Sequence, residues 1–196
     1  MKIHSAEFLI GAASPGQFPP PLLPEVAFVG KSNVGKSSLI NTLLNRKRLV
    51  KTSGTPGKTR EINFFLINER FRFVDLPGYG FSRAAKTKQR SWEGLIETYL
   101  SERSCLKGLV LIFDVRHSPG PLDRAMQGWL EGAGLRYRLI ANKADKLKKS
   151  RLGSQLSQLE QGLALPEPPL AFSAKSRQGC DILWKCLDGW LAEPLN

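Results

Sequence analysis

The chain has 196 residues, which suits one domain, and its 41% hydrophobic and 23% charged residues are ordinary for a globular protein. Its apolar runs are too short to cross a bilayer, its N-terminus lacks a signal-peptide pattern, and its three cysteines form no disulfide framework. We therefore expect a cytoplasmic protein with no membrane partner.

Charge is the unusual feature of the composition, because 29 Lys and Arg stand against 17 Asp and Glu, for a net charge of +12. Such an excess favours a polyanionic partner, since fixed cations displace counterions from a phosphate backbone. A basic surface kept for solubility is the alternative. The basic runs at 83–90 and 143–151 lack the interleaved aromatic residues of a single-strand stacking platform. Shape-led RNA binding fits better than base reading, and no reading of DNA is expected.

The elements can be predicted in chain order. Residues 1–24 are expected to be irregular, because five prolines exclude a helix over most of them. A buried strand at 26–29 precedes a Gly-rich turn and a helix at 36–44, and a loop at 51–60 precedes a hairpin formed by 61–67 and 71–74. Further buried strands are predicted at 109–113, 137–140 and 170–172, followed by an amphipathic segment at 181–191.

Strands that alternate with helices predict a three-layer α/β fold with a mostly parallel sheet. Such sheets bind ligands where loops leave the carboxyl ends of the strands. We expect the domain to span 25–192, with a short tail at 193–196.

The loop after the first strand fits the pattern GxxxxGK[ST] between a predicted strand and a predicted helix. Its residues are Gly30, Lys31, Ser32, Asn33, Val34, Gly35, Lys36 and Ser37. The glycines let backbone N–H groups converge on phosphate oxygens at a helix N-terminus. Lys36 is predicted to reach the β- and γ-phosphates and the Ser37 hydroxyl to bind Mg²⁺.

A second phosphate-sensing motif, DxxG, ends the strand at 71–74. Its residues are Asp75, Leu76, Pro77 and Gly78. The Asp75 carboxylate is placed to hold Mg²⁺ through a water, and the Gly78 N–H can approach a γ-phosphate because no side chain blocks it. In the preceding loop, Thr59 is the best-placed hydroxyl for Mg²⁺ and Thr55 is second. We assign catalytic roles to Lys36, Thr59 and Gly78.

Two later loops predict a guanine pocket. The NKxD motif, Asn142, Lys143, Ala144 and Asp145, follows the strand at 137–140. Asp145 can accept two hydrogen bonds from guanine but would stay unpaired against adenine, which costs about 1–3 kcal/mol. After the strand at 170–172 come Ser173, Ala174 and Lys175, where a backbone N–H can meet the guanine carbonyl.

These motifs together resemble the EngB family, the YihA/YsxC branch of the TrmE–Era-like bacterial GTPases, over roughly residues 5–192. The resemblance implies a Ras-like G domain with a six-stranded sheet, a role in maturing the large ribosomal subunit through rRNA, and a link to cell division and septation. It further implies Mg²⁺ at Ser37 and Thr59 and GTP contacts at 30–37, 75–78, 142–145 and 173–175. Contacts at Gly57, Lys58, Thr59, Arg60 and Glu61 are implied as well.

Two positions bear on the rate of hydrolysis. Tyr79 follows Gly78, where Ras-like proteins carry the Gln that orients the attacking water, so slow intrinsic turnover is expected. Asn33 matches relatives that are activated by K⁺, or it merely supports the turn.

The leading interpretation is a GTPase switch in ribosome assembly. A GTP-gated adaptor for RNA or protein, with incidental hydrolysis, is the alternative. A metabolic kinase is disfavoured because it needs no guanine pocket.

Overall fold

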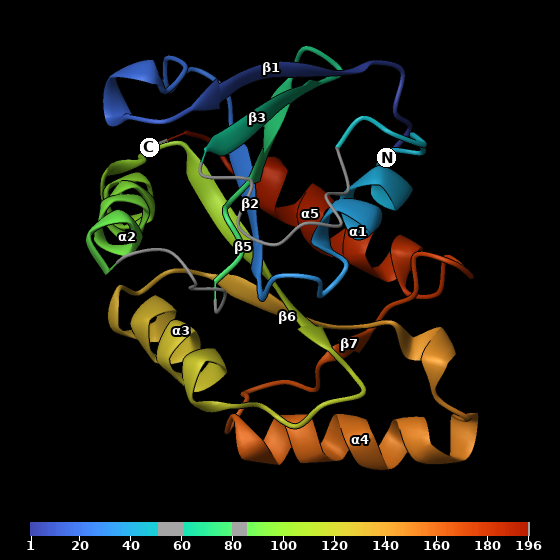
Figure 1. Ribbon diagram of the computed structural model, residues 1–196. Helices are drawn as coiled ribbons and strands as arrows, with labels where there is room; N and C mark the ends of the chain where they lie inside the picture. Colours follow the sequence, from blue (N-terminus) through green and yellow to red (C-terminus); the bar gives the residue numbers. More distant parts are fainter. Residues whose placement is uncertain (51–60, 80–85, 196) are drawn as a thin grey trace.

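The computed structural model describes residues 1–50, 61–79 and 86–195. A seven-stranded sheet with the order β1-β3-β4-β2-β5-β6-β7 forms the centre of the molecule (Figure 1). The strands are β1 (Ala6–Ala12), β2 (Glu25–Gly30), β3 (Ile62–Ile67), β4 (Phe71–Asp75), β5 (Leu106–Asp114), β6 (Tyr137–Asn142) and β7 (Leu170–Ala171). The helices are α1 (Lys36–Leu43), α2 (Lys86–Glu102), α3 (Pro121–Gly132), α4 (Lys149–Gly162) and α5 (Cys180–Leu191). Two short 3₁₀ helices are η1 (Pro15–Gln17) and η2 (Ala144–Lys146).

The sheet is mostly parallel, as predicted. Strands β4, β2, β5, β6 and β7 pair in parallel, and only the β1–β3 and β3–β4 pairs are antiparallel. The carboxyl ends of five strands therefore meet at one edge of the sheet, where ligand sites of α/β proteins form.

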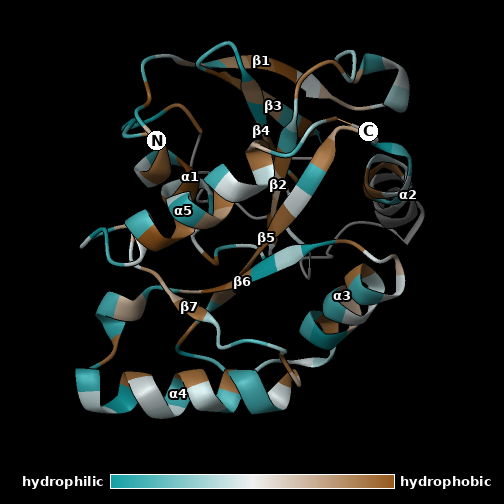
Figure 2. Cartoon of the chain, turned by 180° about the vertical axis from the view of Figure 1, so that it is seen from behind, coloured by the Kyte–Doolittle hydropathy of each residue, from teal (hydrophilic) through white to brown (hydrophobic). Residues whose placement is uncertain are grey.

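Helices cover both faces of the sheet, which gives the predicted three layers (Figure 1). Alternate residues of β2 enter different cores: Val26 and Phe28 pack with α1 and α5, whereas Ala27 and Val29 pack with residues of α2, α3 and α4. This alternation follows from the two-residue period of a strand. Figure 2 shows the hydrophobic residues concentrated along the strands. No helix in the described part of the chain is long and apolar enough to span a bilayer.

The N-terminal segment corrects two expectations. Residues 1–24 are not irregular throughout, because β1 (Ala6–Ala12) pairs antiparallel with β3, and the sheet has seven strands rather than six. The prolines that exclude a helix begin only at Pro15, so they do not prevent a strand before it. A register shift between Phe8 and Ile10 and the exposure of Phe8 and Leu9 remove the simple alternation by which a strand is recognised.

The predicted hairpin is confirmed. Strands β3 and β4 pair antiparallel across a tight turn in which Asn68 and Glu69 have φ angles of 49° and 56°. Both values lie in the left-handed region, and Ile67 pairs with Phe71, so the hairpin loop consists of residues 68–70. The Asn68 Oδ1 atom accepts hydrogen bonds from the backbone N–H groups of His4 (2.7 Å) and Ser5 (3.1 Å), which ties the N-terminus to this turn.

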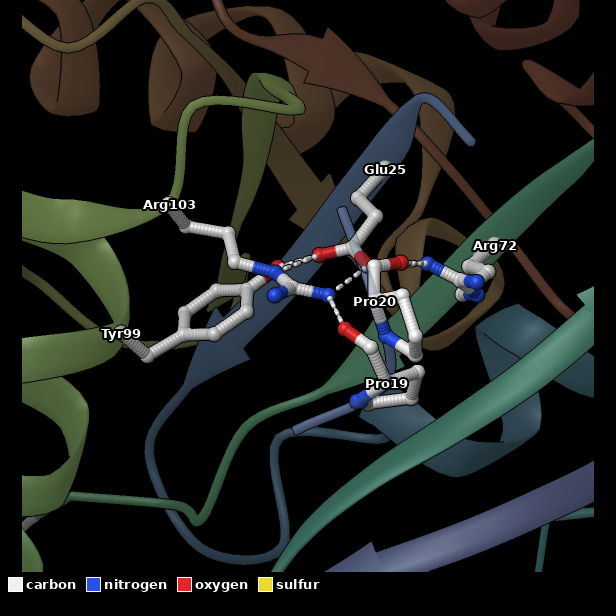
Figure 3. Close-up of polar contacts among 6 residues, drawn as sticks. All are labelled: Pro19, Pro20, Glu25, Arg72, Tyr99 and Arg103. Atoms are coloured by element: carbon white, nitrogen blue, oxygen red, sulfur yellow. Dashed lines mark hydrogen bonds and ion pairs between the residues drawn. The ribbon is translucent and has the colours of Figure 1, made fainter. Parts of the chain in front are cut away.

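A buried charge cluster lies at the amino end of β2, opposite the carboxyl edge (Figure 3). Glu25 is fully buried and accepts hydrogen bonds from Arg72, Arg103 and the Tyr99 hydroxyl. The two guanidinium groups also donate to the carbonyl oxygens of Pro20 (2.8 Å) and Pro19 (2.6 Å) respectively. The cluster thus joins the proline segment to β2, β4 and the residues that follow α2.

Candidate nucleotide-binding site

The phosphate loop leaves β2 and leads directly into α1, as the motif predicts. Gly35 is the residue before the helix and has a φ of 95°, which favours glycine. A Cβ atom at Gly35 would lie 2.5 Å from the Asn142 Nδ2 atom, and one at Gly30 would lie 2.7 Å from the Ile112 carbonyl oxygen. Close neighbours therefore favour glycine at both positions, and at Gly35 the backbone angle favours it as well. The loop has the tight backbone curl that can cradle phosphate.

The structure brings the phosphate-loop lysine and the predicted magnesium aspartate together. The Lys36 Nζ atom forms an ion pair with the Asp75 Oδ1 atom across 39 residues of sequence. Their side chains are only 12% and 6% exposed, so the pair is strongly favoured over separated charges. Ser37 lies in the first turn of α1, next to Lys36. A carboxylate and a hydroxyl are hard oxygen donors, the ligand type that Mg²⁺ prefers, so the donors fit this ion.

The DxxG residues lie directly against the phosphate loop. A Cβ atom on Gly78 would lie 3.2 Å from both the backbone N and the Oγ atom of Ser32, so a side chain there would crowd the loop. Leu76 and Pro77 are buried and serve the core. The backbone thus places Gly78 directly against the phosphate loop, and its contact with a γ-phosphate stays a prediction.

The NKxD motif holds the phosphate loop from the other side. Asn142 donates a hydrogen bond from Nδ2 to the Val34 carbonyl (2.9 Å), and Lys143 donates from Nζ to the Asn33 carbonyl (2.7 Å). The Asn142 Oδ1 atom is buried and accepts no hydrogen bond from any residue that the structure describes. A buried acceptor of this kind is unusual in a native structure and is expected where a ligand contributes the donor.

Asp145 is held by the last predicted loop. The buried Ser173 hydroxyl donates to the Asp145 Oδ1 atom (2.7 Å), and Ser173 in turn accepts from the Ser176 N–H (3.2 Å). Ala144 is buried and donates its N–H to the Phe172 carbonyl (3.0 Å). The Asp145 side chain is 18% exposed, and its Oδ2 atom lies 4.0 Å from the Lys146 Nζ atom. Ser173 thus orients the carboxylate, and its contact with a guanine base stays a prediction.

Asp114, at the end of β5, is a site residue that sequence reasoning missed. Its Oδ2 atom pairs with Lys143 (2.9 Å), and Arg116 binds both carboxylate oxygens, at 2.8 and 2.6 Å. Burial alone would raise the pKa of Asp114, but the hydrogen bonds from Arg116 and Lys143 outweigh it and hold this pKa well below the usual range. The available signal was its position, because Asp75 and Asn142 also end strands of the parallel sheet.

The remaining predicted contacts are in the loop at 51–60, at Glu61 and in the segment after β7. Residues 51–60, which include Thr55, Gly57, Lys58, Thr59 and Arg60, lie outside the described residues. Glu61 is exposed and precedes β3. Lys175 is exposed, and the Ala174 carbonyl accepts a hydrogen bond from the Thr42 hydroxyl (3.4 Å). The roles of these residues remain predictions.

The Tyr79 side chain is buried against α3. Its side chain is 6% exposed, and its hydroxyl donates to the Asp123 Oδ1 atom on α3 (3.0 Å). Tyr79 thus occupies the sequence position of a water-orienting glutamine while its hydroxyl is bound to Asp123, and slow intrinsic turnover stays a prediction.

The fold and this set of loops define a phosphate-loop protein of the guanine-nucleotide-binding class. Residues 25–143 match the family described as 50S ribosome-binding GTPase. A relative from Syntrophus aciditrophicus named "Probable GTP-binding protein EngB" is 51% identical over 179 residues, which cover 91% of each chain. The chain belongs to the EngB family of GTP-binding proteins and is a GTPase.

Solved structures agree with this fold. The crystal structure of a probable GTP-binding protein engB matches 87% of this chain and all of its own, with a TM-score of 0.70 and 22% identity. Era, solved with MgGDPNP and nucleotides of 16S ribosomal RNA, matches 88% of this chain and 58% of its own, with a TM-score of 0.70 and 23% identity. At these identities the likeness supports the Ras-like G-domain fold.

Proposed function

We propose that the protein is a GTP-gated switch that binds the large ribosomal subunit through rRNA during its assembly. One observation carries the proposal: the segment that supplies Asp145 continues into exposed cations at the start of α4. Lys148, Lys149 and Arg151 are exposed and form no ion pair with the residues that the structure describes. Guanine recognition and positive charge for a phosphate backbone thus lie on one short stretch of chain. The family description, 50S ribosome-binding GTPase, supports the same partner, and Era, a neighbour in fold, is solved with ribosomal RNA of the small subunit.

The proposed nucleotide contacts follow from the geometry of the carboxyl edge. Lys36 exchanges its Asp75 partner for the β- and γ-phosphates, while Asp75, Ser37 and Thr59 hold Mg²⁺. Bound Mg²⁺ would supply positive charge at the phosphate oxygens. The Gly78 N–H contacts the γ-phosphate and Asp145 the guanine edge. Loss of the γ-phosphate on hydrolysis removes contacts of Gly78 and Thr59, which links nucleotide state to the shape of the surface.

Turnover by this arrangement is proposed to be slow without an activator, because Tyr79 offers no group to orient water. The competing function, a GTP-gated adaptor, uses the same site but needs no stimulation of hydrolysis. GTP hydrolysis measured with and without large subunits separates the two: stimulation supports the switch, and unchanged turnover supports the adaptor. The link to cell division and septation that the family resemblance implies would be an indirect effect of impaired ribosome assembly.

Potassium is the second proposed cation, near Asn33. This exposed residue of the phosphate loop has a φ of 65°. Because asparagine tolerates that backbone angle, a role in the turn alone is the alternative. Turnover in KCl compared with NaCl tests the proposal, with Asn33→Gly as the variant that keeps the backbone free to adopt the turn. K⁺ activation that survives in Asn33→Gly would assign the side chain to the turn only.

Cosedimentation with purified large subunits tests the ribosomal role. We expect tighter binding with a non-hydrolysable GTP analogue than with GDP, and an affinity that falls steeply with salt. Replacing Lys146, Lys148 and Lys149 by Ala should flatten the salt dependence. A matched control replaces three exposed cations elsewhere, Lys2, Arg70 and Lys185, and should leave it unchanged. Binding that ignores both nucleotide and salt would refute the proposal.

A further inference from the structure

A single carboxylate on α3 contacts the phosphate loop and the residue that directly follows the DxxG motif. Asp123 lies in the first turn of this helix and is 2% exposed. Its Oδ2 atom accepts hydrogen bonds from the Lys31 Nζ atom (2.6 Å) and the Gly120 N–H (2.8 Å). Its Oδ1 atom accepts from the Tyr79 hydroxyl (3.0 Å). Lys31 is the second residue of the phosphate loop, and Tyr79 directly follows Gly78, so Asp123 joins the two motifs to α3.

The backbone at Tyr79 is attached to the same loop. The Tyr79 N–H donates to the Gly30 carbonyl (3.3 Å), and the Ser32 N–H donates to the Tyr79 carbonyl (3.2 Å). Lys31 and Tyr79 therefore form a parallel bridge that extends the pairing of β2 with β4. With its backbone paired and its side chain bound to Asp123, Tyr79 cannot rotate or shift without breaking several hydrogen bonds. The adjacent Gly78 peptide is held in place by the same contacts.

The chemistry of Tyr79 makes Asp123 more than a packing neighbour. A buried hydroxyl needs an acceptor, and within the described residues Asp123 is the one that it has. Burial, and then the charge of Asp123, raise the pKa of Tyr79 well above its ordinary value, so the hydroxyl stays protonated and remains a donor. A hydrogen bond from a neutral donor to a carboxylate is among the stronger kinds in proteins.

We propose that Asp123 is a positioning residue of the nucleotide site, which acts through Tyr79 to hold the Gly78 N–H against the phosphate loop and so favours GTP over GDP. The inference rests on the proposed contact between Gly78 and the γ-phosphate. Asp145 is assigned to the guanine base, which GTP and GDP share, whereas the contact proposed for Gly78 is with the γ-phosphate, which only GTP carries. Loosening Gly78 should therefore weaken GTP selectively.

Two variants separate this role from a structural one. Tyr79→Phe removes only the hydroxyl, and Asp123→Asn removes the charge while it keeps the shape. For each, the Kd of a non-hydrolysable GTP analogue and of GDP is measured with Mg²⁺ by fluorescence titration. We expect the analogue to bind about tenfold more weakly and GDP to change less than twofold, since a hydrogen bond to a charged group is typically worth at least that factor. The double variant should bind no more weakly than the weaker single variant.

Tyr137→Phe is the matched control, because the Tyr137 hydroxyl donates to Glu131 (2.6 Å) at the far end of α3. It should change neither affinity. Equal weakening of GTP and GDP, or no weakening of either, would overturn the proposal. If Asp123→Asn fails to fold, the Tyr79→Phe result alone decides. These titrations contain no ribosomes, so a negative result would count against the role of Asp123 and not against the ribosomal role. If the wild-type protein bound no GDP, the assignment of the nucleotide site itself would be refuted.

Discussion

Buried carboxylates lie at both ends of the central strands, and their partners differ in kind. At the amino end of β2, Glu25 is fully buried between two arginines, Arg72 and Arg103. At the carboxyl end of β4, Asp75 is paired with the single cation of Lys36. Both are ion pairs of low exposure, but only the second lies beside a loop shaped for a ligand.

The difference shows how to tell a structural charge cluster from a functional one. The arginines around Glu25 direct further N–H groups to the carbonyl oxygens of Pro20 and Pro19, so the partners of the cluster are all internal. One buried donor, the Arg72 Nε atom, has no acceptor among the described residues. Lys36 is a point charge with three donors on a flexible stem, and it can leave Asp75 for phosphate. A buried charge whose partners are all internal stabilises the fold, whereas one with an exchangeable partner serves binding.

The largest expected effect is on nucleotide binding by Lys36→Ala. Removal of the ammonium group should weaken Mg-GTP binding by at least about a thousandfold, because a buried charge pair with phosphate loses one partner. Isothermal titration calorimetry measures the affinity, and circular dichroism checks that the fold is native. Tight GTP binding by a natively folded variant would show that Lys36 does not bind phosphate. The Lys36–Asp75 pair would then be structural, like the cluster around Glu25.

At the other end, Glu25→Gln should lower stability without affecting nucleotide recognition. It leaves two buried guanidinium groups without their anion, which costs about 3–5 kcal/mol in the free energy of unfolding. Urea denaturation measures the loss, and Glu7→Gln on the exposed edge strand is the control with the same change of charge. A Glu25→Gln variant of normal stability that bound GTP more weakly would show that the Glu25 cluster serves nucleotide binding rather than the stability of the fold.

The next prediction concerns the guanine pocket, which lies at the same carboxyl edge of the sheet as Lys36 and Asp75. Asp145→Asn should weaken GTP binding about tenfold to a hundredfold and improve binding of xanthosine triphosphate, because an amide matches the exchanged donor and acceptor of xanthine. Competition titrations with the two nucleotides measure this change. Unchanged GTP affinity would show that Asp145 does not contact the base.

The smallest expected effect is a slow, pH-dependent labelling of the Cys105 thiol. The Cys105 carbonyl accepts a hydrogen bond from the Glu25 N–H (2.8 Å). Burial, and then the Glu25 charge, raise the pKa of this thiol to about 11. At pH 8 only about a thousandth of it is the reactive thiolate, and the labelling rate should rise about tenfold per pH unit up to pH 11. The pKa of the Cys105 thiol is higher in the folded than in the unfolded protein, so burial of the protonated thiol contributes to the free energy of unfolding. This contribution is fully present below the unfolded-state pKa and is lost as the pH rises through the folded-state pKa.

Thiol labelling of a variant that carries Cys180→Ser and Cys186→Ser measures this effect at Cys105 alone. Adding Glu25→Gln should speed labelling at pH 8, since it loosens the cluster around the thiol. A rate that is independent of pH would indicate that labelling is limited by opening of the structure rather than by thiolate formation.

Local patterns in the sequence were sufficient for most of the carboxyl edge. The phosphate loop and the NKxD motif were predicted because each binds its ligand with residues a few positions apart, and the phosphate loop needs glycine for its backbone path. Apolar runs of three to five residues between turns were likewise enough to predict the buried strands. The helices α2, α3 and α4 were not predicted. In α4, for example, Leu159 is the sole buried residue, so the hydrophobic period is weak.

By itself, then, the sequence determined the class of fold, the phosphate loop and the preference for guanine, because short-range spacing and residue type carry that information. Only the tertiary structure decided which carboxylates are partners. Asp123 lies 92 residues from Lys31 and 44 from Tyr79, and Glu25 lies 78 from Arg103. No local pattern encodes such pairs, since they form only when the parallel strands align and bring distant loops to one edge of the sheet.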